Sequence, residues 1–154
     1  MIELHREILD EPRLETWKML EQFKGVAVLG GGTALALQIG HRKSYDFDLM
    51  VSEPIKSNLW SKVVRVFGKY TIKTPDNEDQ LNFVTKDNIA VTFLYNEYSF
   101  LFDAIGTESI SLMDVRDIAG DKAMTVGRRG KWHILRTFLI TRSSMREKRL
   151  KPWG

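Results

Sequence analysis

Asp46 and Asp48, two aspartates separated by one residue, are the side chains whose spacing most clearly suggests chemistry. They flank Phe47 at the start of a segment, 47–51, whose pattern predicts a β-strand. Residues i and i+2 of a strand project to the same face, so the two carboxylates would repel each other unless a cation lay between them. Such oxygen ligands suit Mg²⁺, which also takes phosphate oxygens. We therefore predict that both aspartates are metal ligands and catalytic residues; the alternative is a solvated strand end.

A glycine-rich turn, Gly-Gly-Gly-Thr at 30–33, precedes the aspartates. It follows a short apolar segment, 26–29, that we expect to be a buried strand, and it opens a predicted helix. Glycine lets a backbone approach a ligand closely, and a helix N-terminus offers free N–H groups and a positive dipole end. We therefore predict that Gly31, Gly32 and Thr33 bind the phosphates of a nucleotide. The alternative is a tight turn that packing alone requires, since neither a dinucleotide fingerprint nor a P-loop is present.

Two cations and a hydroxyl, Arg42, Lys43 and Ser44, lie between the turn and the aspartates. They could neutralise phosphate charge or merely solvate a loop, and we count Arg42 and Ser44 as candidate nucleotide-binding residues. A two-carboxylate metal clamp beside a turn that holds phosphates is the layout required for phosphoryl or nucleotidyl transfer.

The elements that must position these residues follow from hydrophobic periodicity and from proline and glycine signals. We expect the order α-β-α-β-α-β-β-β-α-α, which predicts a small α+β domain with a mixed sheet flanked by helices. The expected helices cover 3–23 with a restart at Pro12, 34–39, 57–67, 114–126 and 132–141, and the expected strands cover 26–29, 47–51, 70–73, 81–85 and 89–95.

The composition fits one globular domain, because the 154 residues are 43% hydrophobic and 28% charged. No apolar run is long enough to span a membrane and the N-terminus does not resemble a secretory signal, so we expect no membrane partner. The absence of cysteine excludes a disulfide scaffold and fits a cytoplasmic protein. We expect one domain over 1–133 and a separate basic C-terminal segment over 134–154.

Charge is distributed unevenly along the chain. Residues 1–121 carry 13 basic and 19 acidic side chains, whereas residues 122–154 carry 10 basic and 1 acidic. A basic end of this kind can bind nucleic acid, or it can be a solvated tail. A nucleic-acid-binding protein that uses its C-terminus is therefore one alternative function.

The residues around the aspartates resemble the AbiEii/AbiGii-type nucleotidyltransferase toxins, small members of the polymerase-beta-like nucleotidyltransferase superfamily. The resemblance covers about residues 20–133. It rests on Gly31-Gly32-Thr33, on Gly40-His41-Arg42-Lys43-Ser44, on Asp46-Phe47-Asp48-Leu49, and more weakly on residues 117–123 and 127–131.

The resemblance implies a nucleotidyltransferase fold and a Mg²⁺-dependent transfer of a nucleoside monophosphate from an NTP. The acceptor would be an RNA such as tRNA, or a protein side chain. The chain would then be the toxin of a toxin–antitoxin pair, with a cognate antitoxin as partner. The resemblance also places Lys122 on a helix beside the nucleotide and adds it to the catalytic residues, while the family's basic turn would lie at 127–131.

Two departures from the family pattern favour a catalytically impaired nucleotide-binding module as a further alternative. Thr92 stands where related proteins often carry a third acid, and threonine is not an anionic metal ligand. After His133 the family's acidic motif is absent. Loss of one nucleotide could convert that motif into Ile134–Leu139, so we hypothesise a frameshift there, which relatives sharing the basic tail would disprove.

Overall fold

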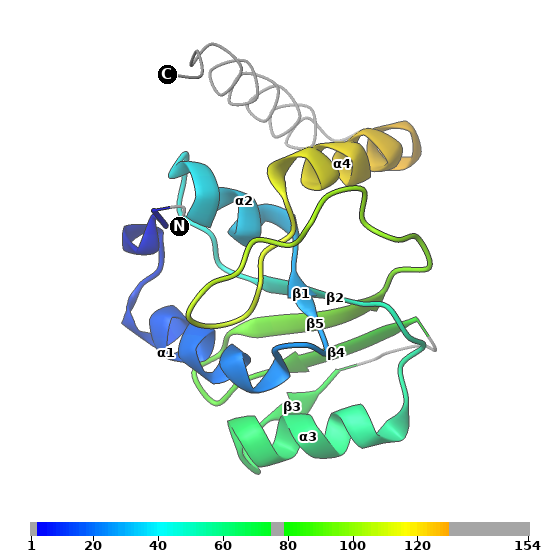
Figure 1. The fold of residues 1–154 in the computed structure, drawn as a ribbon. Coiled ribbons are helices and arrows are strands. Elements are labelled where there is room, and N and C mark those ends of the chain that lie inside the picture. Colours follow the sequence, from blue (N-terminus) through cyan, green and yellow to red (C-terminus); the bar gives the residue numbers. More distant parts are fainter. Residues whose placement is uncertain (1–2, 75–78, 130–154) are drawn as a thin grey trace.

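The computed structural model describes residues 3–74 and 79–129 of the 154-residue chain, with side chains described as far as Met124. Helices and strands alternate along its first half, and three strands then follow one another before the last described helix, in the order that the sequence predicts (Figure 1). In chain order they are η1 (Arg6–Ile8), α1 (Glu11–Met19), η2 (Leu20–Phe23), β1 (Val28–Leu29), α2 (Gly31–Ile39), β2 (Phe47–Val51), α3 (Ser57–Phe67), β3 (Ile72–Lys73), β4 (Gln80–Val84), β5 (Ala90–Tyr95) and α4 (Val115–Arg129).

The strands form one five-stranded sheet in the order β1-β2-β5-β4-β3. Only β2 and β5 pair in parallel, and the other neighbours are antiparallel. The predicted α+β class with a small mixed sheet flanked by helices is therefore confirmed. The register places Asp48 on β2 opposite Thr92 on β5, and Thr92 opposite Asn82 on β4.

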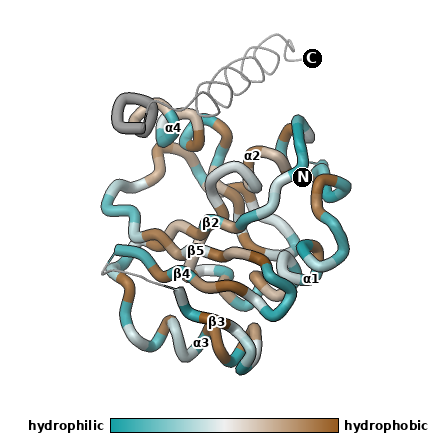
Figure 2. Tube along the Cα trace, turned by 180° about the vertical axis from the view of Figure 1, so that it is seen from behind, coloured by the Kyte–Doolittle hydropathy of each residue, from teal (hydrophilic) through white to brown (hydrophobic). Residues whose placement is uncertain are grey.

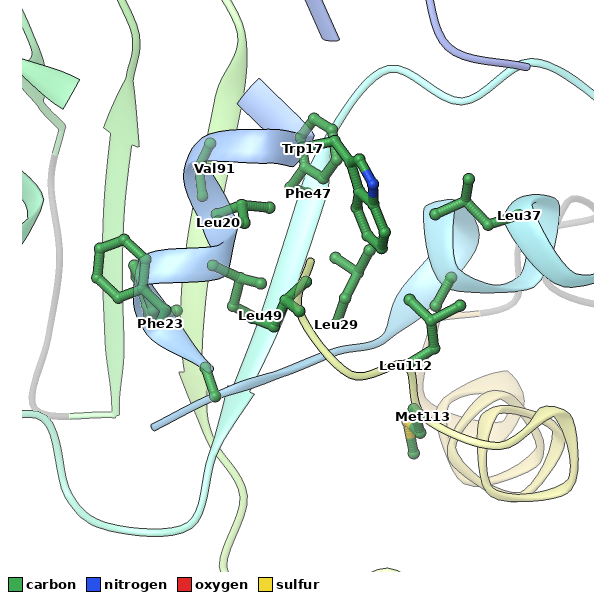
Figure 3. Packing of buried hydrophobic residues seen from close by; sticks show 14 of the residues in the cluster. Trp17, Leu20, Phe23, Leu29, Leu37, Phe47, Leu49, Val91, Leu112 and Met113 are labelled. Carbon is green, nitrogen blue, oxygen red and sulfur yellow. The ribbon is translucent and has the colours of Figure 1, made fainter. Parts of the chain in front are cut away.

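The two faces of the sheet differ because side chains alternate along each strand. One face is buried against the helices, and Figure 3 shows part of this packing between the α1–η2 segment and the strands. Its strand residues are Phe47, Leu49, Val51, Leu81, Phe83, Val91 and Phe93. Aromatic rings from the helices complete the core: Phe67 of α3 lies 5.2 Å from Phe83, and Phe23 of η2 lies 5.2 Å from Phe93, between ring centroids.

The opposite face is only half-buried. Helices α1 and α3 lie on the near side of the sheet in Figure 1, and Figure 2, from behind, shows β2, β5 and β4 with no helix in front of them. Its residues at the centre of the sheet are Asp48, Met50, Asn82, Thr92 and Leu94, all of intermediate exposure. The sheet therefore presents a polar row, Asp48–Thr92–Asn82, on the side away from the aromatic core.

The helix restart predicted at Pro12 is confirmed, because Asp10 caps α1 with its side chain and Pro12 lies in the first turn of this helix. Other predicted boundaries are wrong for local reasons. Helix α2 already begins at Gly31, since the glycines supply its first turn. Helix α4 continues to Arg129, so the first residues of the expected basic turn at 127–131 are helical.

The remaining C-terminal predictions concern residues outside the described part of the chain. These are the helix over 132–141, the separate segment over 134–154 and the frameshift after His133. Within the described residues, no helix combines the length and apolar character needed to cross a membrane.

Backbone hydrogen bonds attach the segment before α4 to strand β1. Leu29 of β1 donates its N–H to the carbonyl of Ser111 over 2.9 Å, and Met113 donates to the carbonyl of Leu29 over 2.8 Å. Asp114 then caps α4, because its carboxylate accepts from the N–H of Arg116 over 2.8 Å. The segment 111–113 thus extends the sheet beyond β1 and starts α4 next to it.

Candidate active site

The glycine turn and the start of β2 are in direct contact. Gly30 donates its N–H to the carbonyl of Asp48 over 2.8 Å. Gly31 has a φ of +62°, and a Cβ at this position would collide with Oδ2 of Asp48. Glycine is therefore required at position 31 for two reasons, a left-handed backbone and the close approach of a carboxylate. The turn supports the side chain of Asp48.

The next glycine makes room for a cation. A Cβ on Gly32 would lie 2.6 Å from Nη2 of Arg42, so the guanidinium lies directly over the start of α2. Gly30, the residue before this helix, gives it no side-chain cap. The first N–H groups of a helix have no partner within the helix and carry a partial positive charge. Arg42 and the N-terminus of α2 therefore make this end of the site electropositive.

Buried hydroxyl groups hold the loop that leads to Asp46. Thr33 donates its hydroxyl to the carbonyl of Asp46, and Ser44 Oγ lies 2.7 Å from Thr33 Oγ1. With the Thr33 proton used in this way, Ser44 is the donor of the second bond. From the other side, Arg13 Nε donates to the carbonyl of Tyr45 over 3.0 Å. In this arrangement Thr33 and Ser44 position the aspartates, and their predicted contact with phosphate stays a prediction.

The charges of Asp46 and Lys122 both influence the ionisation of Asp48. Burial is the main cause that raises the pKa of the Asp48 carboxyl above its ordinary value; Lys122 opposes this rise, and the charges of Asp46 and Asp121 add to it. Asp46 itself is exposed. The fold thus brings Lys122 close enough to Asp48 to influence its ionisation, although the two residues lie on different elements far apart in sequence.

Asp121 is a residue of this site that the sequence analysis missed. It precedes Lys122 on α4, and its charge also disfavours ionisation of Asp48. The only available signal was its position beside Lys122 on a predicted helix. Thr92 lies next to Asp48 in the sheet, which fits the prediction that the family's third acid is replaced here. Within the described residues, no group of three or more His, Cys, Asp or Glu side chains is placed to hold a metal ion.

Comparisons with known proteins identify the fold. No protein-family model and no curated protein sequence matches the chain. Two solved structures are similar: a protein described as a candidate nucleotidyltransferase from H. pylori, with a TM-score of 0.53 and 22% identity over 74% of this chain, and JHP933 from Helicobacter pylori, with a TM-score of 0.52 and 21% identity over 77%. The matches cover 59% and 57% of those two chains. The predicted nucleotidyltransferase fold is therefore confirmed, and this chain spans less than two thirds of either structure's length.

Proposed function

We propose that this protein is a Mg²⁺-dependent nucleotidyltransferase, which moves a nucleoside monophosphate from an NTP to a hydroxyl group of an acceptor. The observation that carries the proposal is the surroundings of Asp48. A half-buried carboxylate lies beside Asp46 at the start of β2, against a glycine turn, with Arg42 over that turn and Lys122 acting from α4. Two acids and two cations thus surround the N-terminus of one helix.

The donor set fits a magnesium ion. Mg²⁺ is commonly held by one or two protein carboxylates together with phosphate oxygens of the substrate. Asp46 and Asp48 would hold it. The charge of Asp46 disfavours ionisation of Asp48, and a bound cation would relieve this repulsion. When bound, the metal would neutralise phosphate charge and orient the triphosphate.

The chain's own groups would bind and orient the nucleotide. The N–H groups at the start of α2, at Gly31 and Gly32, would donate to phosphate oxygens, and Arg42 would add a positive charge. Lys122 would stabilise the negative charge that develops on the phosphates. The acceptor oxygen attacks the α-phosphorus, the bond to the bridging oxygen breaks, pyrophosphate leaves, and the hydroxyl proton passes to solvent.

The acceptor we propose is an RNA such as tRNA, with a protein side chain as the alternative. The role we propose is that of a toxin with a cognate antitoxin, acting in the cytoplasm. Support comes from the sequence resemblance over residues 31–49 to the AbiEii/AbiGii-type toxins. The lack of cysteine in the 154 residues adds support for the compartment.

Transfer of label from an NTP tests the proposal. The protein is incubated with Mg²⁺, total tRNA and NTPs that carry ³²P at either the α- or the γ-phosphate. We expect label in the acceptor from the α-position only. Asp48→Asn should reduce the transfer by about a hundredfold or more, and Asp87→Asn, the same change at an exposed turn, should leave it intact. Transfer from the γ-position, or full activity of Asp48→Asn, would contradict the proposal.

Thr92 favours a second candidate function, a module that binds nucleotide without turnover. Thr92 is the β5 partner of Asp48 in the sheet register, and the sequence resemblance implies a third carboxylate at this position. Such a module would bind NTP with Mg²⁺ but transfer no label. Thr92→Asp would then create transfer activity, whereas an active enzyme would already show it with Thr92 in place.

A further inference from the structure

A second charged region lies on α3 and β3, on the helix-covered side of the sheet. Residues 54–74 contain five basic side chains and no acidic one. The rest of residues 1–121 contains 8 basic and 19 acidic side chains. Lys56 pairs with Glu53 over 3.0 Å, so the positive charge of this segment comes from its other four basic side chains.

Three cations, Lys62, Arg65 and Lys69, lie on α3 or directly after its end. Leu59, Val63 and Phe67 are buried in the core, so the opposite side of the helix faces solvent. Lys62 and Arg65 lie on the helix three residues apart. Arg65 is exposed, whereas Lys62 is half-buried with its ammonium 5.1 Å from the centre of the Phe23 ring. Lys69 is exposed and follows Gly68, the residue at which the helix ends. Within residues 3–74 and 79–124, no carboxylate pairs with these three cations.

Aromatic rings lie among these cations. The ammonium of Lys69 is 5.2 Å from the centre of the Tyr70 ring, and that of Lys73 is 5.9 Å from the centre of the Trp60 ring. Tyr70 is 69% exposed. Surfaces that bind single-stranded nucleic acid combine positive charge along the backbone with aromatic rings on which bases stack. We define the basic face as Trp60, Lys62, Arg65, Lys69, Tyr70 and Lys73.

We propose that the basic face binds the phosphodiester backbone of single-stranded nucleic acid. Its cations could replace the counterions of successive phosphates, and the exposed Tyr70 ring could stack a base. A protein partner fits less well, because the centres of protein interfaces are apolar and depleted in lysine, whereas the cations of this face surround few exposed apolar groups, chiefly Tyr70 and Ile72.

The basic face and the active site are separate surfaces. Phe67 of α3 packs on Phe83, which belongs to the aromatic face of the sheet, whereas Asp48 belongs to the other face. Nucleic-acid binding at α3 and β3 therefore requires neither NTP nor Mg²⁺. It can be measured whether or not the transfer reaction occurs.

The salt dependence of oligonucleotide binding tests this inference. The full chain is titrated into fluorescent oligo-U RNA and oligo-dT of equal length at several salt concentrations, without Mg²⁺ or NTP. A plot of log K against log salt has a negative slope, to which each phosphate contact contributes about −0.7 for a single strand. In the triple variant Lys62→Gln/Arg65→Gln/Lys69→Gln, the magnitude of this slope should be smaller by about 2. The control, Lys18→Gln/Lys24→Gln/Lys86→Gln, neutralises three cations at exposed positions elsewhere and should keep the original slope.

Further variants separate this inference from folding and from the proposed reaction. Thermal melting shows whether both triple variants are folded. The single variant Arg65→Gln, at an exposed position, should still reduce the magnitude of the salt slope by about 0.7. Asp48→Asn should bind as the unmodified protein does, so loss of transfer activity does not affect the test.

Several outcomes would overturn the inference. An unchanged slope in the triple variant would place nucleic-acid binding elsewhere, for instance at the basic residues 122–154. An equal decrease in the control would show a dependence on net charge alone. Polyglutamate that competes as well as RNA would indicate an acidic protein partner instead. Equal binding of RNA and DNA supports recognition of the backbone, and a preference for RNA supports it with an added contact to the 2′-hydroxyl.

Discussion

The two faces of the central strands carry different kinds of residue at alternate positions. On β2, β5 and β4 one face consists of Phe, Leu and Val side chains under η2 and α3, and the other presents Asp48, Thr92 and Asn82 in register. The aromatic face removes apolar area from water, which stabilises the fold. The polar face includes a carboxyl whose pKa burial raises, so its ionised form costs folding free energy. Stability and chemistry should therefore respond to different substitutions along the same strands.

The largest expected effect is on the aromatic face. Phe93 is fully buried and packs near Phe23 and Phe83. Phe93→Ala should lower the free energy of unfolding by about 3–5 kcal/mol through lost burial and a residual cavity. Urea denaturation measures it, with Leu94→Ala, the next residue on the polar face, as the control. A control that loses as much stability would contradict the contrast between the faces.

The next effect distinguishes the two aspartates. Asp46→Asn and Asp48→Asn should each reduce label transfer by about a hundredfold or more, which corresponds to about 2.7 kcal/mol. Only Asp48→Asn should also raise the melting temperature at neutral pH, because it removes a charge that burial disfavours, while Asp46 is exposed. Destabilisation by Asp48→Asn would show that the carboxylate holds the fold together.

A pair of glycines isolates the contact between the turn and the acid. Gly25 and Gly31 both have positive φ, but a Cβ on Gly25 meets nothing within 4 Å, whereas one on Gly31 collides with Asp48. Gly25→Ala should cost about 1–2 kcal/mol for its backbone conformation alone. Gly31→Ala should cost more and should also weaken Mg²⁺-dependent nucleotide binding. Chemical denaturation and calorimetry give both values, and equal costs at the two positions would exclude the contact.

The smallest effect is the pH dependence of stability. The pKa of Asp48 is raised in the folded state, so its contribution to stability is full below the ordinary aspartate pKa and is lost as pH rises through the raised value. The stability of Asp48→Asn relative to the unmodified protein should therefore increase as the pH is raised from about 4, the ordinary aspartate pKa, to neutral. Denaturation midpoints over this range test it; the opposite trend would mean that the folded state favours the ionised carboxyl.

Local pattern was sufficient to predict most of the elements that surround the candidate site. The pattern in 47–51 predicted β2 with its bounds, and α2 ends at Ile39 as predicted, with Gly40 after it in the left-handed conformation. The start of α2 could not be predicted from propensity, because Gly31 and Gly32 are poor helix formers, and contacts with Asp48 and Arg42 keep them in the first turn.

Long-range pairing explains most of what sequence reasoning could not provide. Lys122 was assigned by resemblance alone, and its approach to Asp48 depends on pairing of Leu29 with residues 111–113. Backbone pairing over such a distance leaves no periodic signal. The hydrogen bonds of Thr33 with Ser44 and with the carbonyl of Asp46 depend likewise on the path of the loop.

Calorimetric titration with each NTP, with and without Mg²⁺, tests the central claim most directly. We predict that binding requires Mg²⁺ and is lost in Asp46→Ala/Asp48→Ala, while melting shows the variant to be folded. Binding without Mg²⁺, or binding retained in the variant, would contradict the assignment of metal and triphosphate to this site. No binding of any NTP would mean that the glycine turn only supports the fold.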